Sequence, residues 1–339
     1  MIKNNKFFIK DLKKVVFLGV FENFENLIEI NNVLGLETEI ITSSSQSKLM
    51  PKNIKHKIFN STKGSFVKYI KKSCKIKNTL FFSISARYIF KKDKIKNLFN
   101  YNLVNFHETR LPLDGGGAVF SWNIMREDKI CNHTIHLLNE GVDNGSILHS
   151  NKSIYPYHCK TPSDFKKVSD ERFIETYRKF VEKLNNGKKF QLLSQNNGIG
   201  RYNPRIDTAK NGWIDWDMEP HDLINFINAF DEPYKGASTY IDNRKFGRLF
   251  IKKAHLHAGD SSNHPFMQGI ISRHDGEWIV VSTKGKYMLL IEKVLDKNAK
   301  NILSQLKPGD RFFTTANDLK KSKDSRVFFT AKGKKYKRV

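Results

Sequence analysis

Short apolar runs rich in β-branched and aromatic residues recur through the first half of the chain, and segments with helically spaced apolar residues separate them. The runs expected to be strands are 15–20 (VVFLGV), 39–42, 80–85, 103–107 and 134–138. The segments expected to be helices are 24–34, 65–72, 92–98 and 163–184, the last with Ser163 as its N-cap. Continuous apolar strands that alternate with helices are typical of a parallel sheet covered on both faces. The pattern predicts a doubly wound, Rossmann-like α/β domain over residues 15–190.

The second half of the chain has a different pattern, and its 339 residues exceed the usual size of a single core. A polar, Gly-rich stretch over residues 191–205 indicates a linker. Beyond it lie a helical segment and five segments typical of strands: 220–230, then 238–241, 246–258, 269–273, 278–283 and 288–294. Turn residues at 242–243 and 275–276 separate some of them, and FFTT at 312–315 suggests one more strand. These features predict a small, OB-like β-barrel over residues 206–339.

The composition is strongly basic. The chain has 59 Lys and Arg residues against 34 Asp and Glu, a formal net charge of +25, and its one dense cluster is the Lys-rich tail at 332–338. This charge attracts nucleic acids, nucleotide-linked metabolites and acidic lipid surfaces, and its sign does not choose among them. The hydrophobic share of 39% excludes a disordered chain.

Cysteine usage and hydropathy favour a cytoplasmic protein with no membrane partner. Cys74, Cys131 and Cys159 form no CxxC pair, so neither a disulfide framework nor a zinc knuckle is expected. The apolar runs fall far short of the about 20 residues that a membrane span needs. Residues 1–14 lack a long apolar core and a cleavage site, and we interpret them as a short extension before the first strand.

The segment that best indicates chemistry lies where the predicted strand 103–107 ends. In open α/β sheets, ligands bind beyond the carboxyl ends of the strands. Asn105 and His107 stand two residues apart and therefore share a face of this strand. A neutral histidine accepts a proton and an asparagine amide donates to a developing oxyanion. Together they suit the attack of an amine on an acyl group.

Two glycine-containing turns complete this set. Asp143 lies between Gly141 and Gly145 after the strand 134–138, where its carboxylate orients or charge-stabilises His107. The turn 115–117 (GGG) leads into a helix whose N-terminus faces an anion in some proteins. Taken singly, a strand-end histidine or a turn aspartate is more often structural, and a Gly-rich turn indicates only a positive φ. Their combination favours a catalytic site.

These residues make the chain resemble the folate-dependent formyltransferases, which include glycinamide ribonucleotide, methionyl-tRNA and nucleotide-sugar N-formyltransferases. The family's motifs are Asn-x-His, Leu-Pro, a Gly-containing turn and Asp-x-Gly, and the matching residues are Asn105, His107, Leu111, Pro112, 115–117, Asp143 and Gly145. The sequences IDW at 214–216 and AFDEPYKGAST at 229–239 are similar to those that open the C-terminal barrel of the tRNA and sugar enzymes. The short purine-pathway enzyme lacks that domain.

The resemblance implies formyl transfer from N10-formyltetrahydrofolate to a primary amine, with no metal. It assigns proton transfer to His107, oxyanion stabilisation to Asn105, and the orientation of His107 or of a water to Asp143. The residues expected to bind the donor are Ser85, Arg87, Tyr88, Phe90, Gly141 and Val142, although Tyr88 and Phe90 equally suit a core. The family's small residues after the catalytic histidine are replaced here by Glu108-Thr109-Arg110, which alters the acceptor contacts expected of this loop.

Two acceptors stay open. A tRNA enzyme of this family carries an Arg-rich loop after the second strand, but residues 42–50 (TSSSQSKLM) are nearly uncharged. A nucleotide-linked amino sugar is therefore preferred, with Trp122, Trp213 or Trp216 as candidates to stack the base. Methionyl-tRNA is the alternative. The family's sugar enzymes are commonly dimers, which makes a homodimer an expectation as well.

A protein of another class also fits the charge. A basic chain with a barrel and a Lys-rich tail suits a nucleic-acid-binding module with a vestigial active site, although the intact Asn105, His107 and Asp143 oppose this interpretation. His255, His257 and His264 do not fix a closed ligand set, so no metal site is expected.

Overall fold

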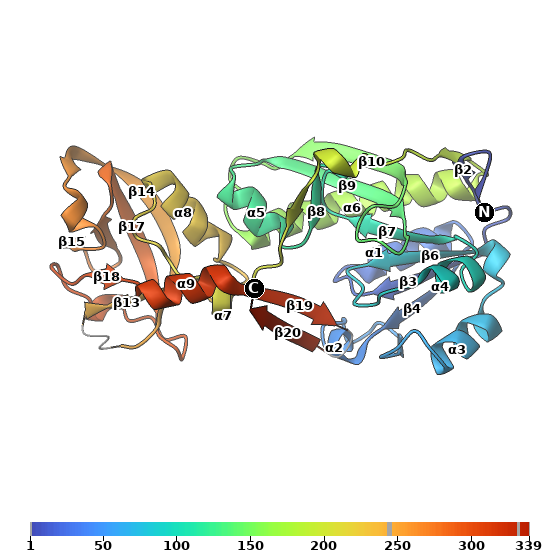
Figure 1. Cartoon of the computed structure of the whole chain (residues 1–339), viewed down its shortest axis with the longest axis horizontal. Helices are drawn as coiled ribbons and strands as arrows, with labels where there is room; N and C mark the ends of the chain where they lie inside the picture. Colours follow the sequence, from blue (N-terminus) through green and yellow to red (C-terminus); the bar gives the residue numbers. More distant parts are fainter. Residues whose placement is uncertain (1, 243–245, 331–332, 339) are drawn as a thin grey trace.

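The N-terminal part is built on a seven-stranded sheet with the order β10-β9-β7-β6-β3-β4-β5. The computed structural model describes residues 2–242, 246–330 and 333–338. The strands of this sheet are β3 (Lys14–Gly19), β4 (Glu37–Thr42), β5 (Lys57–Ile58), β6 (Thr79–Ile84), β7 (Leu103–His107), β9 (Ile130–Leu137) and β10 (Ile147–Ile154) (Figure 1). Strands β3 to β7 pair in parallel, whereas β9 and β10 are antiparallel. The predicted mostly parallel sheet is confirmed.

Helices cover both faces of this sheet: α1 (Phe24–Val33), α3 (Ser65–Ser73), α4 (Lys92–Asn97) and α6 (Pro162–Asn185). Every side chain of β6 is buried, because alternate residues of a strand point to opposite faces and each face has its own helices. Phe82 packs against Phe173 and Tyr177 of α6. Phe81 contacts Phe99 in the cluster that α3 and α4 cover.

The start of α6 differs from the prediction. Thr161 is its N-cap, since the Thr161 side chain accepts from the Asp164 N–H and the Asp164 carboxylate accepts from the Thr161 N–H. Pro162 occupies the first turn, where no backbone donor is needed. Ser163 lies inside the helix, so the assignment of Ser163 as the cap is wrong.

The N-terminal extension is itself folded into the structure. Strand β2 (Lys6–Phe7) pairs with β1 (Ile2–Lys3) and with β11 (Phe190–Gln191), which follows α6. Phe7 is fully buried in the main core, which explains why this segment is held against the domain.

The C-terminal part contains a six-stranded antiparallel sheet with the order β15-β16-β17-β14-β13-β18. Its strands are β13 (Ala237–Ile241), β14 (Leu249–Asn263), β15 (Ile271–His274), β16 (Ile279–Ser282), β17 (Gly285–Leu295) and β18 (Phe312–Phe313), and α8 (Pro220–Ala229) precedes them. The sheet curls, and a bridge between Ile270 and Arg311 links its two edge regions. The predicted set of C-terminal strands is thus confirmed as a curled antiparallel sheet. The turn expected at 242–243 falls partly outside the described residues.

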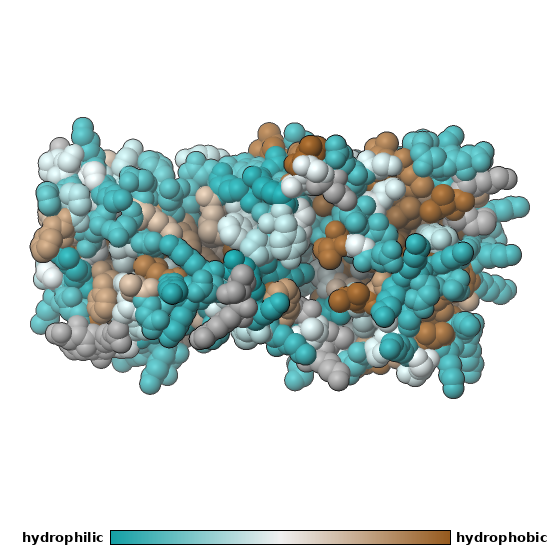
Figure 2. All heavy atoms as spheres, in the orientation of Figure 1, coloured by the Kyte–Doolittle hydropathy of each residue, from teal (hydrophilic) through white to brown (hydrophobic). Residues whose placement is uncertain are grey.

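The chain ends in α9 (Ala316–Asp324) and a hairpin of β19 (Ser325–Thr330) and β20 (Gly333–Arg338). The hairpin runs from the C-terminal sheet back toward the N-terminal part (Figure 1). The Lys-rich tail is therefore largely a strand. Hydrophilic side chains cover most of the face seen in Figure 2, as a net charge of +25 leads us to expect.

Candidate active site

A cavity of about 250 Å³ opens at the carboxyl end of β7. It contains Asn105, His107 and Asp143, which the sequence predicts as catalytic, together with Ser85 and Val142 from the predicted donor site. Its remaining lining residues are Ala86, Phe106, Glu108, Thr109, Gly116, Gly117, Ala118, Val119, Tyr202 and Arg205. The three predicted catalytic groups therefore do lie in one cavity.

The imidazole of His107 is largely buried, and its Nε2 lies near the Asp143 carboxylate. Its Nε2 lies 3.6 Å from Asp143 Oδ2, which is too long for a hydrogen bond but close enough for attraction between charges. This buried nitrogen has no hydrogen-bond partner in the described part of the chain. A buried, unsatisfied ring nitrogen is costly unless a ligand occupies it.

Asn105 is oriented by a histidine that the sequence did not single out. His136 Nδ1–H donates to the carbonyl of Leu137 at 2.8 Å, which leaves Nε2 as an acceptor. The Asn105 amide donates to that Nε2 at 3.1 Å. This hydrogen bond fixes the orientation of the Asn105 amide and therefore the direction of its second N–H. An amide N–H held in this way suits the stabilisation of an oxyanion.

The charge state of His107 follows from its surroundings. Burial lowers the pKa of His107, the Asp143 carboxylate opposes this effect, and the Arg205 guanidinium adds to it. Burial also lowers the pKa of His136, to about 4. Both imidazoles are therefore neutral at pH 7, so His107 is able to accept a proton.

Three contacts fix the turn that carries Asp143. The Gly116 N–H donates to Asp143 Oδ2 at 3.2 Å. The Gln195 amide donates to the carbonyls of Asp143 and Gly145 at 2.9 and 2.6 Å. A Cβ on Gly145 would lie 1.7 Å from the carbonyl oxygen of Leu137, so only glycine fits there. Gln195 was assigned to the linker, and no pattern in the sequence identifies it.

The linker also completes the cavity from the other side. Strand β12 (Arg201–Asn203) pairs in parallel with β8 (Asp114–Gly116), the Gly-rich turn that the sequence did identify. Arg205 follows β12, and its side chain lies directly over Gly117, where a Cβ would meet Arg205 Cγ at 2.6 Å. A segment that composition marks as a linker thus contributes a cation to the active-site cavity.

An aspartate anchors this paired segment. Asp114 is buried and accepts from Arg110 and from Arg201, and Arg126 lies 3.7 Å away. Burial raises the pKa of Asp114, but the hydrogen bond from Arg201 and the charge of Arg110 outweigh it, so the net shift is downward. The carboxylate stays ionised and ties β8 to β12.

Replacing Gly116 with alanine is expected to destabilise the protein by about 1–3 kcal/mol, because strain at a special backbone conformation costs this much. Gly116 has φ +98°, and a Cβ would lie 2.1 Å from the carbonyl oxygen of Asn203. Gly115→Ala on the same strand is the control, since its Cβ would have only one neighbour, at 3.9 Å. Urea unfolding of both variants tests this, and equal stabilities would contradict it.

Glu108, the residue that replaces a small one in the family pattern, follows His107 in the chain and has a partly buried carboxyl. It accepts from the Ser169 hydroxyl at 3.2 Å. Burial, reinforced by the negative charge of Asp170, raises the pKa of Glu108 to about 7. This carboxyl is therefore partly protonated near neutral pH.

The Glu108 carboxyl predicts a pH dependence of stability. The folded state holds its proton above the ordinary pKa of 4.5 and up to about 7, so wild-type stability falls as pH rises through this window. Glu108→Gln, which has no such proton, is expected to lose this part of the slope. Urea unfolding at several pH values from 4.5 to 7 measures it, and parallel curves for the two proteins would refute the assignment.

Several predicted donor-binding residues lie outside the cavity. Phe90 is 2% exposed and packs edge-on against Phe99, and the Tyr88 hydroxyl donates to the carbonyl of Phe59. Arg87 donates to the Ser45 hydroxyl. Gly141 also does not line the cavity. Of the loop after β6, only Ser85 and Ala86 reach it.

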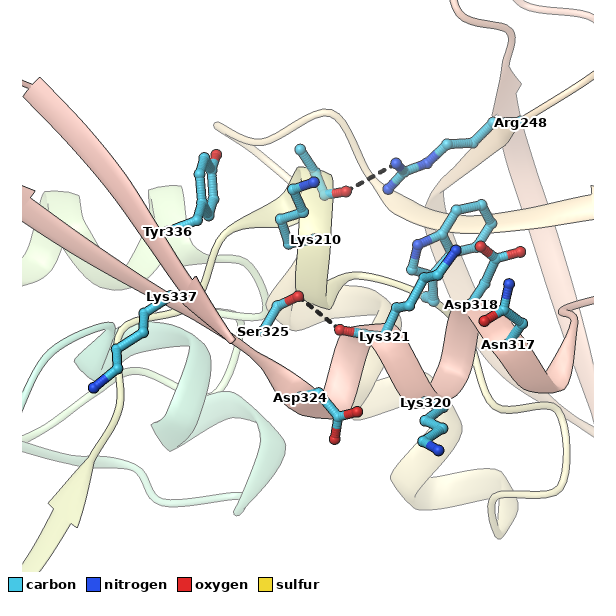
Figure 3. Close-up of a pocket in the computed structure, with 12 residues that line it drawn as sticks. Lys210, Arg248, Asn317, Asp318, Lys320, Lys321, Asp324, Ser325, Tyr336 and Lys337 are labelled. Carbon is cyan, nitrogen blue, oxygen red and sulfur yellow. Dashed lines mark hydrogen bonds between the residues drawn. The ribbon is translucent and has the colours of Figure 1, made fainter. Parts of the chain in front are cut away.

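A larger cavity, of about 570 Å³, lies in the C-terminal part and shares no lining residue with the cavity of His107 (Figure 3). Two of its charged groups have structural roles: Arg248 donates to the carbonyl of Ala209 and stacks on Trp213, and Asp318 accepts from the hydroxyl of Thr315, the N-cap of α9. Lys320 and Lys337 point away from one another in this view. Trp213 and Trp216 are buried, so neither presents a free face to a base.

Metal and membrane features are absent from the described residues. Within 2–242, 246–330 and 333–338, no group of three His, Cys, Asp or Glu side chains is placed to hold a metal ion. No helix in these ranges has the length and apolar character of a membrane span.

Comparison with known proteins identifies one family and several relatives. The family profile described as Formyl transferase, C-terminal domain matches residues 207–307. The bifunctional polymyxin resistance protein ArnA of Wigglesworthia glossinidia brevipalpis is 27% identical over 221 residues, 63% of this chain and 33% of that protein. Methionyl-tRNA formyltransferase of Clostridium perfringens is 26% identical over 211 residues, 62% of this chain and 64% of that protein. The chain thus spans about a third of the length of the first relative and just under two thirds of the length of the second.

Two solved structures share the fold. The sugar 3N-formyltransferase WlaRD, crystallised with dTDP and 5-N-formyl-THF, superposes with a TM-score of 0.58 at 18% identity, over 84% of this chain and 98% of that one. The N-formyltransferase of Helicobacter canadensis, in complex with folinic acid and dTDP-3-aminofucose, gives 0.57 at 17% identity, over 83% and 99% of the two chains.

Proposed function

Because the chain belongs to the folate-dependent formyltransferase family, we propose that it transfers a formyl group from N10-formyltetrahydrofolate to a primary amine. The observation that carries this proposal is the buried Nε2 of His107, which has no hydrogen-bond partner among the described residues and lies 3.6 Å from Asp143. Asn105 lies on the same strand face, in a cavity at the end of a parallel strand.

The bound donor would supply an electrophilic formyl carbon: the amine forms a bond to this carbon, the bond from the carbon to N10 breaks, and N10 takes up the proton that the amine lost and leaves as tetrahydrofolate. His107 Nε2 faces the cavity and accepts the proton that the attacking amine loses. The Asn105 amide, held by His136, donates to the oxygen that gains negative charge. Asp143 stabilises the imidazolium that forms, from a turn fixed by Gly116 and Gln195. Ser85, which has a φ of +50°, and Ala86 line the cavity and are the residues of this loop that would border the donor.

The acceptor is proposed to be a nucleotide-linked amino sugar. The loop after β4 begins with α2 (Ser44–Ser47) and carries Lys48, Lys52 and Lys55 but no arginine, so it lacks the Arg-rich character expected of a loop that grips the phosphates of a tRNA stem. The names of the solved neighbours agree with this choice. Methionyl-tRNA is the second candidate, since a sequence relative bears that name.

We propose in addition that the curled C-terminal sheet is the small OB-like barrel expected from the sequence. The hydrogen bonds between 269–271 and 310–312 that link its edges support this. On this proposal residues 15–190 carry the catalysis and residues 206–339 form the second domain.

A panel of acceptors tests the function. The purified protein is incubated with N10-formyltetrahydrofolate and either dTDP- or UDP-linked amino sugars or methionyl-tRNA, and tetrahydrofolate release and acceptor mass are followed. Formylation of a nucleotide-linked sugar alone supports the proposal. Formylation of methionyl-tRNA alone would show that the acceptor is a tRNA and not a sugar. If N10-formyltetrahydrofolate stays unconsumed with every acceptor, the proposed reaction is wrong.

A further inference from the structure

The proposed reaction leaves one proton without an acceptor. Primary amines such as the α-amino group and lysine have pKa values of about 8 to 10.4, so at pH 7 the acceptor is mostly an ammonium with no lone pair for attack. This ammonium must lose two protons to become a neutral N-formyl group. His107 passes one of them to N10 of the donor and is then neutral again. The other proton needs a second base in the same cavity.

Glu108 is the side chain that is free to take this proton. Of the residues that line the cavity of His107, only Glu108 and Asp143 carry a carboxyl group. Asp143 is already in use, since its Oδ2 accepts from the Gly116 N–H and lies 3.6 Å from His107 Nε2. In the part of the chain that the structure describes, Glu108 accepts one hydrogen bond, at its Oε1, and pairs with no cation. Its Oε2 is therefore available to a ligand.

Ser169 of α6 holds the Glu108 carboxyl in place. The Ser169 hydroxyl lies 3.2 Å from Glu108 Oε1 and 3.0 Å from His133 Nε2. Burial lowers the pKa of His133 to about 4, so this imidazole is neutral at pH 7. Its Nε2–H donates to the Ser169 oxygen, and the hydroxyl donates in turn to Glu108. This buried chain of hydrogen bonds fixes the carboxyl at the wall of the cavity.

The charges around Glu108 match its proton affinity to this task. Burial raises the pKa of Glu108 to about 7, and the negative charge of Asp170 adds to this effect. The Ser169 hydrogen bond and the charge of Lys166 oppose it. Burial also raises the pKa of the other titratable groups that act on this carboxyl, which are neutral at pH 7: Cys131, Tyr155 and Tyr234. A base whose pKa is close to that of the amine accepts its proton more readily than an ordinary carboxylate.

We infer that Glu108 is a second catalytic base, which binds the ammonium of the acceptor and removes its first proton. The inference rests on the proposed function and adds a residue to it. An N–H bond of the ammonium breaks, its electron pair stays on nitrogen, and the proton moves to Glu108 Oε2. The free amine then attacks the formyl carbon, and its second proton reaches N10 by way of His107. Glu108 returns its proton to water after the product leaves, so each transfer releases one proton.

Glu108→Gln tests the inference, because glutamine keeps the shape and the acceptor for the Ser169 hydroxyl but takes up no proton. Its kcat/KM for the acceptor is expected to be at least about tenfold lower at pH 7, since no more than about a tenth of the amine is then uncharged. The difference is expected to shrink by about tenfold per pH unit up to the pKa of the amine, because the variant uses the free amine. Initial rates from about pH 7 to 10, with the acceptor that the panel identifies, measure both effects.

Two further variants control this test. Glu171→Gln removes an exposed acid of α6 that does not line the cavity, and it is expected to match the wild type at every pH. Glu108→Asp keeps a carboxyl and is expected to retain the wild-type pH profile at a lower rate. Urea unfolding of Glu108→Gln shows whether a lost rate reflects lost folding, and the Glu108→Asp profile then decides.

The outcomes separate this inference from the proposed function. A deficit of Glu108→Gln that closes as pH rises, with Glu171→Gln unchanged, supports the inference. Wild-type rates in folded Glu108→Gln at pH 7, a deficit that does not depend on pH, or a Glu108→Asp rate that rises with pH in the manner expected of Glu108→Gln overturns it and leaves the formyl transfer intact. A wild-type protein that formylates no acceptor overturns the proposed function and the inference together.

Discussion

His107→Ala is expected to lower kcat by about 10²- to 10⁴-fold, the usual contribution of a positioned general base. The reason is geometric: His107 Nε2 is a buried nitrogen in the cavity and has no hydrogen-bond partner among the described residues, and the lowered pKa of His107 keeps the imidazole neutral and able to accept a proton. Steady-state rates with saturating donor and acceptor measure the loss.

The stability of His107→Ala and the activity of a second histidine variant are the controls for this prediction. The cavity lies at the end of β7 rather than in the core clusters, so the urea midpoint is expected to stay close to that of the wild type. His158→Ala, at an exposed position, is the matched variant and is expected to keep full activity. A His107→Ala enzyme that turns over at the wild-type rate would exclude His107 from proton transfer.

Asp143→Asn is expected to reduce kcat by a comparable factor, about 10²-fold or more, because the imidazolium that forms on His107 loses its counter-charge. The carboxylate lies 3.6 Å from His107 Nε2. Asparagine keeps the shape and is able to accept from the Gly116 N–H, so the turn is expected to persist. A pH–rate profile checks the electrostatic origin: since Asp143 raises the pKa of His107, the acidic limb is expected to move to lower pH.

Glu140→Gln is the control for this prediction, because Glu140 is an exposed acid near the same turn. Its rates and pH profile are expected to match those of the wild type. If Asp143→Asn kept the wild-type rate and acidic limb, Asp143 would have no electrostatic role in catalysis and only a structural one.

The parts of the molecule that the sequence predicts are those that repeat a physical pattern. Strands buried on both faces are continuous apolar runs, which is why 80–85 and 103–107 are readily found. Asn105 and His107 are predicted to share a face because side chains of a strand alternate between its two faces. The end of the apolar run places both residues near the end of the strand. Asp143, the aspartate proposed for catalysis, is noticeable in the sequence because Gly141 and Gly145 flank it.

Residues that act through long-range contacts leave no such pattern. Gln195 and Arg205 lie in a stretch that composition marks as a linker, and only the pairing of β12 with β8 brings that stretch to the cavity. Conversely, Phe90 belongs to the loop after β6, which was expected to bind the donor. Its large apolar side chain instead packs in the core beside Phe99. The β19–β20 hairpin was missed as well, because lysine-rich strands resemble a solvated tail.

The decisive assay follows a radiolabelled formyl group from N10-formyltetrahydrofolate to the amine of a nucleotide-linked sugar, with wild type and His107→Ala assayed side by side. We expect label on the sugar nitrogen with the wild-type enzyme and a rate at least about a hundredfold lower in the variant. Label that stays on the donor, or that reaches the amine equally fast without His107, would contradict it.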